Sequence, residues 1–170
     1  MQKTALAALI FILVQTQLYS SETTREIYLS PGVSLGYTFG DGLTWGGQIS
    51  MGTFKFEEGE GLAWGNMIGP VVGVTAGYRG SRLRTIKYLD TQVSAGEIPI
   101  WPGIGLGTAW VTPKGSDDTE LYLHLKGWGW LFGALQVDRF FNKSGSFYSV
   151  SGVVLLPLPV SRLGTGTEND

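Results

Sequence analysis

The sequence predicts an all-β fold, a single antiparallel up-and-down β-barrel of about eight strands that crosses a membrane. Three observations favour this fold class. Apolar and small polar residues alternate along most of the chain, which is the period of a β-strand. Charged residues make up only 15% of the 170 residues, well below the roughly 25% of a typical soluble domain. Beyond the N-terminus, no segment has the length and apolar continuity of a transmembrane helix, so a crossing needs strands, which lipid tolerates only as a closed barrel.

The first residues have the features of a secretory signal peptide. Lys3 supplies a positive charge, residues 5–14 form an apolar run, and Ser20 offers a small residue for cleavage. The apolar run is about half as long as the roughly twenty residues of a membrane-spanning helix. We therefore expect residues 1–20 to be removed on export and residues 21–170 to form the barrel domain. An N-terminal membrane anchor or a buried helix is the alternative.

The first three strands are predicted from alternation that is interrupted by turns. From position 29 the odd-numbered residues are apolar up to Phe39, and small or polar residues lie between them. The Gly-Asp-Gly turn at residues 40–42 leads to a second strand with Trp45 and Ile49 on its apolar face. After an acidic turn at residues 57–61, the even-numbered residues from 62 to 78 form the apolar face of a third strand.

The remaining strands follow further turns along the chain. A fourth strand is clearest from Leu89, and a loop at residues 97–102, which contains two prolines, separates it from a fifth strand at 103–110. After a turn at residues 114–118, a sixth strand begins at Leu121. Residues 128–137 and 147–156 form the last two strands. Because an up-and-down barrel with an odd number of strands cannot close antiparallel, we place a tight turn at residues 126–129 and count eight strands rather than seven.

Aromatic residues are predicted to mark the two membrane interfaces, where their amphipathic rings are enriched. A Gly-x-Gly-Leu-x-Trp-Gly motif occurs at residues 40–46 and again at 59–65. Since the strands after the two copies run in opposite directions, Trp45 and Trp64 should lie at opposite rims, with Phe54 or Phe56 near Trp64. The predicted interfacial aromatics are Tyr37, Phe39, Trp45, Trp64, Tyr78 and Trp110. The alternative is that these rings form the core of a soluble sandwich.

The face opposite the apolar one favours a membrane protein. A soluble sandwich would present Lys, Glu and Arg between its buried positions, whereas these positions are mostly Gly, Ser, Thr and Gln. Small polar residues suit a narrow lumen, and apolar residues suit a wall in lipid. On this pattern the chain resembles the small eight-stranded outer-membrane barrels, the class of the OmpA transmembrane domain and OmpX. The resemblance implies a location in the outer membrane of a Gram-negative bacterium.

The partner that we expect is membrane lipid, and we expect the protein to be a monomer. The net charge of −2 and the scattered basic residues argue against binding to nucleic acid. A structural or small-ligand-binding role is predicted, without catalysis and without a cofactor. The main alternative is a soluble periplasmic β-sandwich or lipocalin-like binding protein.

No residue pattern predicts a reaction. The chain has no cysteine and only one histidine, which excludes disulfides, thiolate catalysis and a multi-histidine metal site. Outer-membrane lipid A deacylases, which the chain resembles in size, have a serine soon after their histidine, whereas Leu125 and Lys126 follow His124. We therefore expect His124 to be a hydrogen-bonded lumen or turn residue, and a lipid-modifying enzyme is a distant third possibility. The Gly-x-Gly-x-Gly run at residues 103–107 favours close packing inside a barrel over a dinucleotide loop, because no helix follows it.

A polar network inside the lumen is the candidate site. The polar residues predicted to point inward from the fourth and sixth strands are Asp90, Gln92, Tyr122, His124 and Lys126. We expect Asp90 and Lys126 to pair, because buried charges need partners. The network could line a polar pathway or a small-ligand site. We favour an ion-pair network that plugs the barrel, since an eight-stranded interior holds only side chains or one small ligand.

Overall fold

The structure, a computed structural model, describes residues 25–55, 71–94, 101–130, 134–156 and 158–160. Nine strands form in these residues, and no helix among them has the length and hydropathy that a membrane crossing requires. The strands are β1 (Arg25–Thr38), β2 (Gly42–Lys55), β3 (Val71–Gly80), β4 (Arg84–Ser94), β5 (Trp101–Pro113), β6 (Glu120–Trp130), β7 (Ala134–Asn142), β8 (Gly145–Leu155) and the short β9 (Leu158–Pro159).

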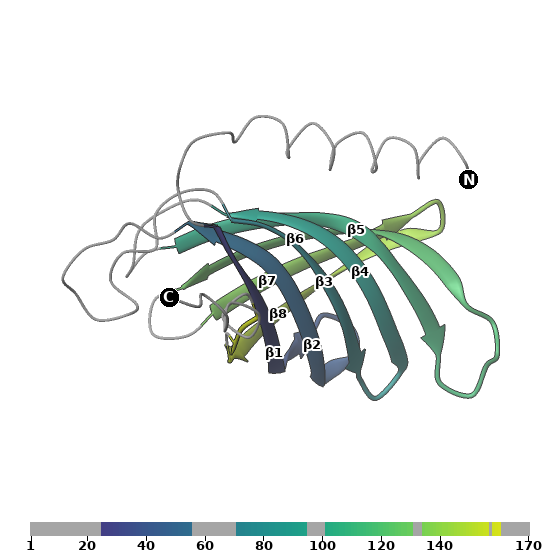
Figure 1. Cartoon of the computed structure of the whole chain (residues 1–170). Helices are drawn as coiled ribbons and strands as arrows, with labels where there is room; N and C mark the ends of the chain where they lie inside the picture. The colour runs from purple at the N-terminus through teal and green to yellow at the C-terminus, as the bar shows by residue number, and fades with distance from the viewer. Residues whose placement is uncertain (1–24, 56–70, 95–100, 131–133, 157, 161–170) are drawn as a thin grey trace, which may run out of the picture.

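Strands β1 to β8 form a closed antiparallel barrel, as the alternation predicts (Figure 1). Each strand pairs with the next one along the chain, and β1 closes the sheet by pairing with both β2 and β8. Leu35, for example, lies opposite Trp45 of β2 and Gly152 of β8. Strand β9 adds a short pairing with Tyr28 and Leu29 of β1.

The two ends of the barrel differ in their connections. Strands β1–β2, β3–β4, β5–β6 and β7–β8 join at one end, which we call the turn end. The chain enters β1 and leaves β8 at the other end, the terminal end. The turn between β1 and β2 has Gly40 at φ 89° and Gly42 at φ 91°, in the left-handed region that glycine adopts without strain. The predicted turn at residues 40–42 is therefore confirmed.

The tight turn predicted at residues 126–129 is wrong. Strand β6 runs without interruption from Glu120 to Trp130, and Gly127 and Gly129 pair there with Val137 and Leu135 of β7. These two glycines alternate with inward-facing Lys126 and Trp128, so they occupy outward positions of a strand rather than a turn. Eight strands nevertheless close the barrel, because the connection between β6 and β7 comes later, at residues 131–133, which lie outside the described residues.

Smaller differences concern the ends of other strands. The predicted loop at 97–102 ends earlier than expected, because Pro102 belongs to β5 and pairs with Gly129, close to the strand start, where proline is tolerated. Strand β9 follows the predicted last strand. The predicted signal peptide, the predicted acidic turn at 57–61 and the first part of the predicted third strand lie outside the described residues.

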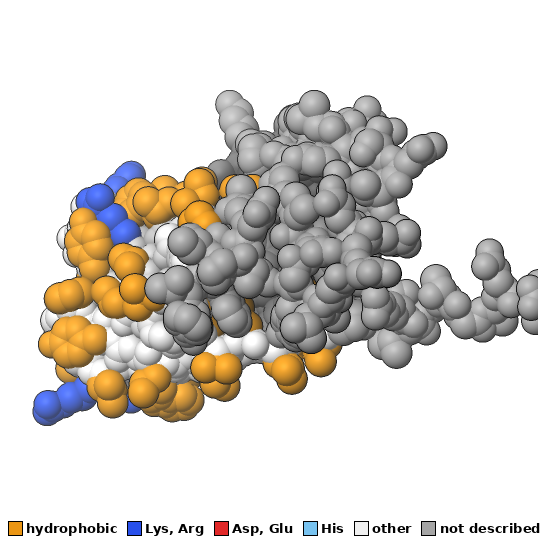
Figure 2. Space-filling view, turned by 90° about the vertical axis from the view of Figure 1, so that its left-hand side faces the viewer, with side chains coloured by type: hydrophobic (Ala, Val, Ile, Leu, Met, Phe, Trp, Pro, Cys, Tyr) orange, Lys and Arg blue, Asp and Glu red, His pale blue; other side chains and the backbone are white. Residues whose placement is uncertain are grey.

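The barrel is apolar outside, and most of its buried side chains are polar. On β1 the exposed fractions of Val33 and Leu35 are 66% and 60%, whereas the intervening Ser34 is 8% exposed. Other strands repeat the pattern, and Figure 2 shows hydrophobic side chains over the visible outer wall, with Lys and Arg at its margin. The buried polar side chains include Arg79, Asp90, His124, Lys126 and Asp138. This distribution is the inverse of that in a soluble protein, in which charged residues are seldom fully buried.

Candidate functional site

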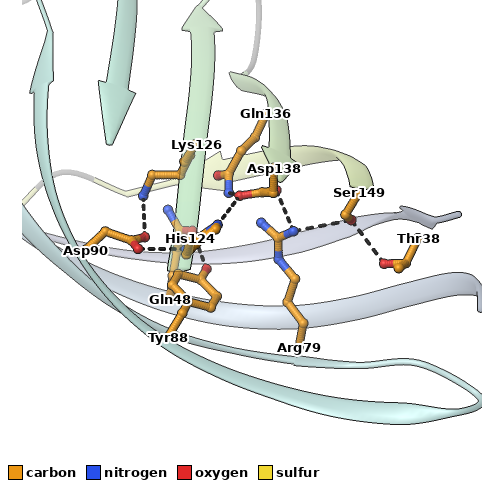
Figure 3. Close-up of polar contacts among 10 residues, drawn as sticks. All are labelled: Thr38, Gln48, Arg79, Tyr88, Asp90, His124, Lys126, Gln136, Asp138 and Ser149. Carbon is orange, nitrogen blue, oxygen red and sulfur yellow. Dashed lines mark hydrogen bonds and ion pairs between the residues drawn. The ribbon is translucent and has the colours of Figure 1, made fainter. Parts of the chain in front are cut away.

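Three of the predicted lumen residues meet at the centre of the barrel interior (Figure 3). Asp90 projects from β4, and His124 and Lys126 project from β6. His124 Nδ1 lies 2.7 Å from Asp90 Oδ1, and Lys126 Nζ donates a hydrogen bond of 3.1 Å to Asp90 Oδ2. All three side chains are at most 1% exposed. Asp90 thus forms a buried ion pair with Lys126 while its second oxygen contacts the imidazole.

A second ion pair extends this cluster across the lumen. Arg79 of β3 donates from Nη1 to Asp138 Oδ2 of β7 over 2.6 Å, and both side chains are buried. Asp138 Oδ1 lies 2.8 Å from His124 Nε2 and also accepts a hydrogen bond of 2.8 Å from Gln136. Ser149 accepts from Arg79 and from Thr38, which extends the polar contacts to β8 and β1. We call the five charged or titratable members the charged layer: Arg79, Asp90, His124, Lys126 and Asp138.

His124 is the centre of the charged layer, because each of its ring nitrogens faces a carboxylate oxygen. An imidazolium donates a hydrogen at both nitrogens, whereas a neutral ring has a single N–H. The geometry therefore matches the protonated ring, which joins the two aspartates. Its faces are also occupied: the Phe140 ring stacks on it with centroids 4.4 Å apart, and Tyr88 meets it edge-on at 5.1 Å.

Three glycines make room for the charged layer and its neighbours. Gly107 lies between Asp90 and His124 in the strand register, so the two side chains meet across β5. A Cβ on Gly107 would overlap the Leu89 carbonyl oxygen and Asp90 itself. A Cβ on Gly105 would lie 3.0 Å from Lys126 Cε, and one on Gly103 would overlap the Trp128 ring. The glycine run at residues 103–107 thus serves close packing inside the barrel.

An apolar layer fills the lumen between the charged layer and the turn end. Its buried members are Ile86, Tyr88, Ala109, Val111 and Phe140, with Tyr122 and Phe147 packed against them. Phe147 stacks on Phe140 with ring centroids 4.7 Å apart, and the Arg84 guanidinium carbon lies 4.3 Å from the Phe147 centroid. Arg84 in turn forms a two-point ion pair with buried Asp41, which Ser81 also contacts. The interior is therefore packed with side chains from the middle of the barrel to the turn end.

Two of the predicted lumen residues lie outside the charged layer. Gln92 is half-buried on the inward face of β4, opposite Gly105, and makes no side-chain hydrogen bond within the described part of the chain. Tyr122 belongs to the rim of the turn end, where its hydroxyl donates to Glu120 and its ring packs edge-on against Phe147. Strand parity predicts the face on which a residue lies but not its depth along the barrel.

The predicted interfacial aromatics gather near the turn end, on the outer wall or the adjoining turn. Tyr37 and Phe39 are in edge-to-face contact with centroids 5.6 Å apart, and Trp45 lies 6.1 Å from Tyr78. These four rings and Trp110 are all exposed. Trp64 and Phe56, which were expected at the opposite rim, lie outside the described residues, and the side chain of Phe54 is not described.

Sequence reasoning missed Arg79 and Asp138 as members of the site. Arg79 shares the inward parity of Thr75 and Gly77, so alternation alone could have identified it. Asp138 was missed because the seventh strand was predicted to end at residue 137, whereas β7 continues to Asn142. Asp138 alternates with outward-facing Val137 and Arg139, and this alternation indicates that its side chain faces inward.

No group of acidic, histidine or cysteine side chains in the described residues could hold a metal ion.

No protein-family model matches the sequence, and no curated protein or solved structure matches it.

Proposed function

We propose that the protein spans a bacterial outer membrane as a structural β-barrel whose lumen is sealed, and that it catalyses no reaction. The observation that carries this proposal is the inverted distribution of polarity. Leu43 and Val33 on the outer wall are 67% and 66% exposed, while the side chains of the charged layer are at most 1% exposed. Exposed apolar side chains are unfavourable in water, whereas an apolar outer wall and a polar interior are typical of a membrane barrel.

The two interior layers support the proposal of a sealed lumen. Side chains of the charged layer meet across the barrel through ion pairs of 2.6–3.1 Å. The apolar layer and the Asp41–Arg84 pair lie between them and the turn end. An eight-stranded barrel has room only for its interior side chains or for one small ligand, and here the side chains occupy the described interior. These contacts favour a plug over an open polar pathway.

The surroundings of His124 support the absence of catalysis. A general base needs a free nitrogen within hydrogen-bonding reach of a substrate proton. Both nitrogens of His124 are engaged by carboxylates, and the ring is 0% exposed. His124 is therefore placed to hold the interior together rather than to act on a lipid. Incubation of the wild type with labelled lipid A or phospholipid should give no more product than incubation of His124→Ala.

Two measurements test the proposal. Membranes of cells that express the full chain should retain the protein, and only detergent should release it. The extracted protein should then migrate differently on a gel with and without heating, because a closed barrel resists unfolding in detergent. Recovery in the soluble periplasm without detergent would refute the membrane location and favour a soluble binding protein. Release by detergent without a heat-dependent shift would refute the closed barrel.

A further inference from the structure

We propose that the outer wall beside Lys87 carries a binding site for one anionic phospholipid, whose phosphate pairs with Lys87 and whose acyl chain lies in an apolar groove. This inference rests on the proposed membrane location and adds a specific lipid to it. It starts from an unusual cation. Lys87 points outward from β4 and is exposed on a wall that is otherwise apolar around it, and it makes no hydrogen bond or ion pair with the described residues.

The position of Lys87 fits the headgroup layer of a membrane. In the strand register it lies between Tyr78 of β3 and Trp110 of β5, two exposed aromatics near the turn end. Tyr and Trp prefer the membrane–water interface, and a lysine stem can lie along apolar surface while its ammonium reaches that level. The phosphates of membrane lipids occupy the same level, so they can pair with Lys87, which has no anionic partner among the described residues.

A shallow groove, largely open to the surroundings, runs along the wall next to Lys87, on the side toward the terminal end. Its formation has a simple cause. Gly47 and Ala76 occupy outward positions and have little or no side chain, while the longer Ile49, Tyr78 and Leu89 stand around them. The lining is almost wholly apolar, which suits an acyl chain, and Lys87 at the edge is its only charged residue.

Arg139 on β7 provides a matched comparison. It is also an outward cation beside exposed aromatics near the turn end. Its guanidinium carbon, however, lies 5.2 Å from the Tyr148 centroid and 5.6 Å from that of Phe141, so rings of the protein already engage it. Arg139 is not among the residues that line the groove. A general attraction of cations to an anionic membrane would involve both residues, whereas the proposed site needs Lys87 alone.

The test is native mass spectrometry of the protein extracted from membranes, after addition of equal amounts of phosphatidylglycerol and phosphatidylcholine with identical acyl chains. Wild type should retain one phosphatidylglycerol in preference to phosphatidylcholine by about fivefold, the effect of one lysine near an anionic headgroup. Lys87→Gln should reduce the preference to about one, and Arg139→Gln should leave it unchanged. Ala76→Phe, which fills the groove, should reduce retention of both lipids. The heat-dependent gel shift verifies that each variant is folded.

Three results would overturn the inference. Equal retention of the two lipids by wild type would exclude recognition of the anionic headgroup, and equal losses in Lys87→Gln and Arg139→Gln would exclude a specific site. Retention of neither lipid by folded wild type would exclude a lipid site at the groove. Flotation with phosphatidylcholine vesicles separates the two proposals: a protein that floats but shows no preference keeps its membrane location and loses the lipid site.

Discussion

The buried pair of Asp90 and Lys126 gives the most direct test of the sealed lumen. The side chains are 0% and 1% exposed, so solvent hardly screens them. Removing one partner of such a pair costs about 3–5 kcal/mol, because the other charge remains buried without compensation. We expect Lys126→Met and Asp90→Asn each to lower the free energy of unfolding by that amount. Methionine retains much of the lysine stem and asparagine retains the carboxylate shape, so packing changes little.

The double variant distinguishes a pair from two independent residues. It contains neither charge of the pair, so no unpaired charge remains buried between these two positions. It still loses the contact between His124 Nδ1 and the Asp90 carboxylate. We therefore expect it to lose about as much stability as either single variant, which corresponds to a coupling energy of about 3–5 kcal/mol.

Urea unfolding in phospholipid vesicles, followed by tryptophan fluorescence, measures these differences. Lys143→Met, which removes an exposed cation from the β7–β8 turn, should change the free energy by no more than about 0.5 kcal/mol. Strictly additive losses would refute the pairing. Single losses below about 1 kcal/mol, the range of solvent-exposed pairs, would refute a dry lumen.

Three further predictions concern the wall, the packing and the lumen. Ile49→Arg, in the middle of β2, should lower the free energy of unfolding in vesicles by about 2–4 kcal/mol, and Tyr78→Arg near the interface by about 0–1 kcal/mol; equal losses would argue against contact with lipid. Gly107→Ala should lower the free energy of unfolding by about 1–3 kcal/mol, because the added carbon overpacks the interior. Gly127→Ala should leave the free energy of unfolding unchanged, because no atom lies within 4 Å of the added carbon. A larger loss for Gly127→Ala than for Gly107→Ala would contradict the described packing. Planar-bilayer recordings of wild type should show no steady unitary conductance, and reproducible conductance steps would contradict a sealed lumen.

The fold was largely predictable because strand alternation and turns are local properties of the sequence. Val33 and Leu35 alternate with Ser34, and the Gly-Asp-Gly turn at residues 40–42 separates two such runs. The strand count was right, although the turn at 126–129 was misplaced. That turn was inferred only because antiparallel closure needs an even number of strands, and closure does not indicate where along residues 120–137 the chain turns. The pairing of Gly127 and Gly129 with β7 shows that β6 continues through them.

The candidate site could be predicted only in part. Parity placed Asp90, His124 and Lys126 on the inward face, because that property depends only on odd or even position in a strand. Their depth along the barrel, and therefore their contacts, depends on the stagger between neighbouring strands. Tyr122 shares the parity of His124 but lies two residues closer to the start of β6, at the rim of the turn end.

The sequence by itself determined that the wall is apolar, that the interior is polar and that no cysteine or histidine cluster can serve chemistry. Closure of the barrel decided which interior residues meet. Arg79 and Asp138 are 59 positions apart on β3 and β7, and nothing local in the chain links them. They form an ion pair because closure brings non-adjacent strands face to face across a lumen too narrow for water to separate buried charges.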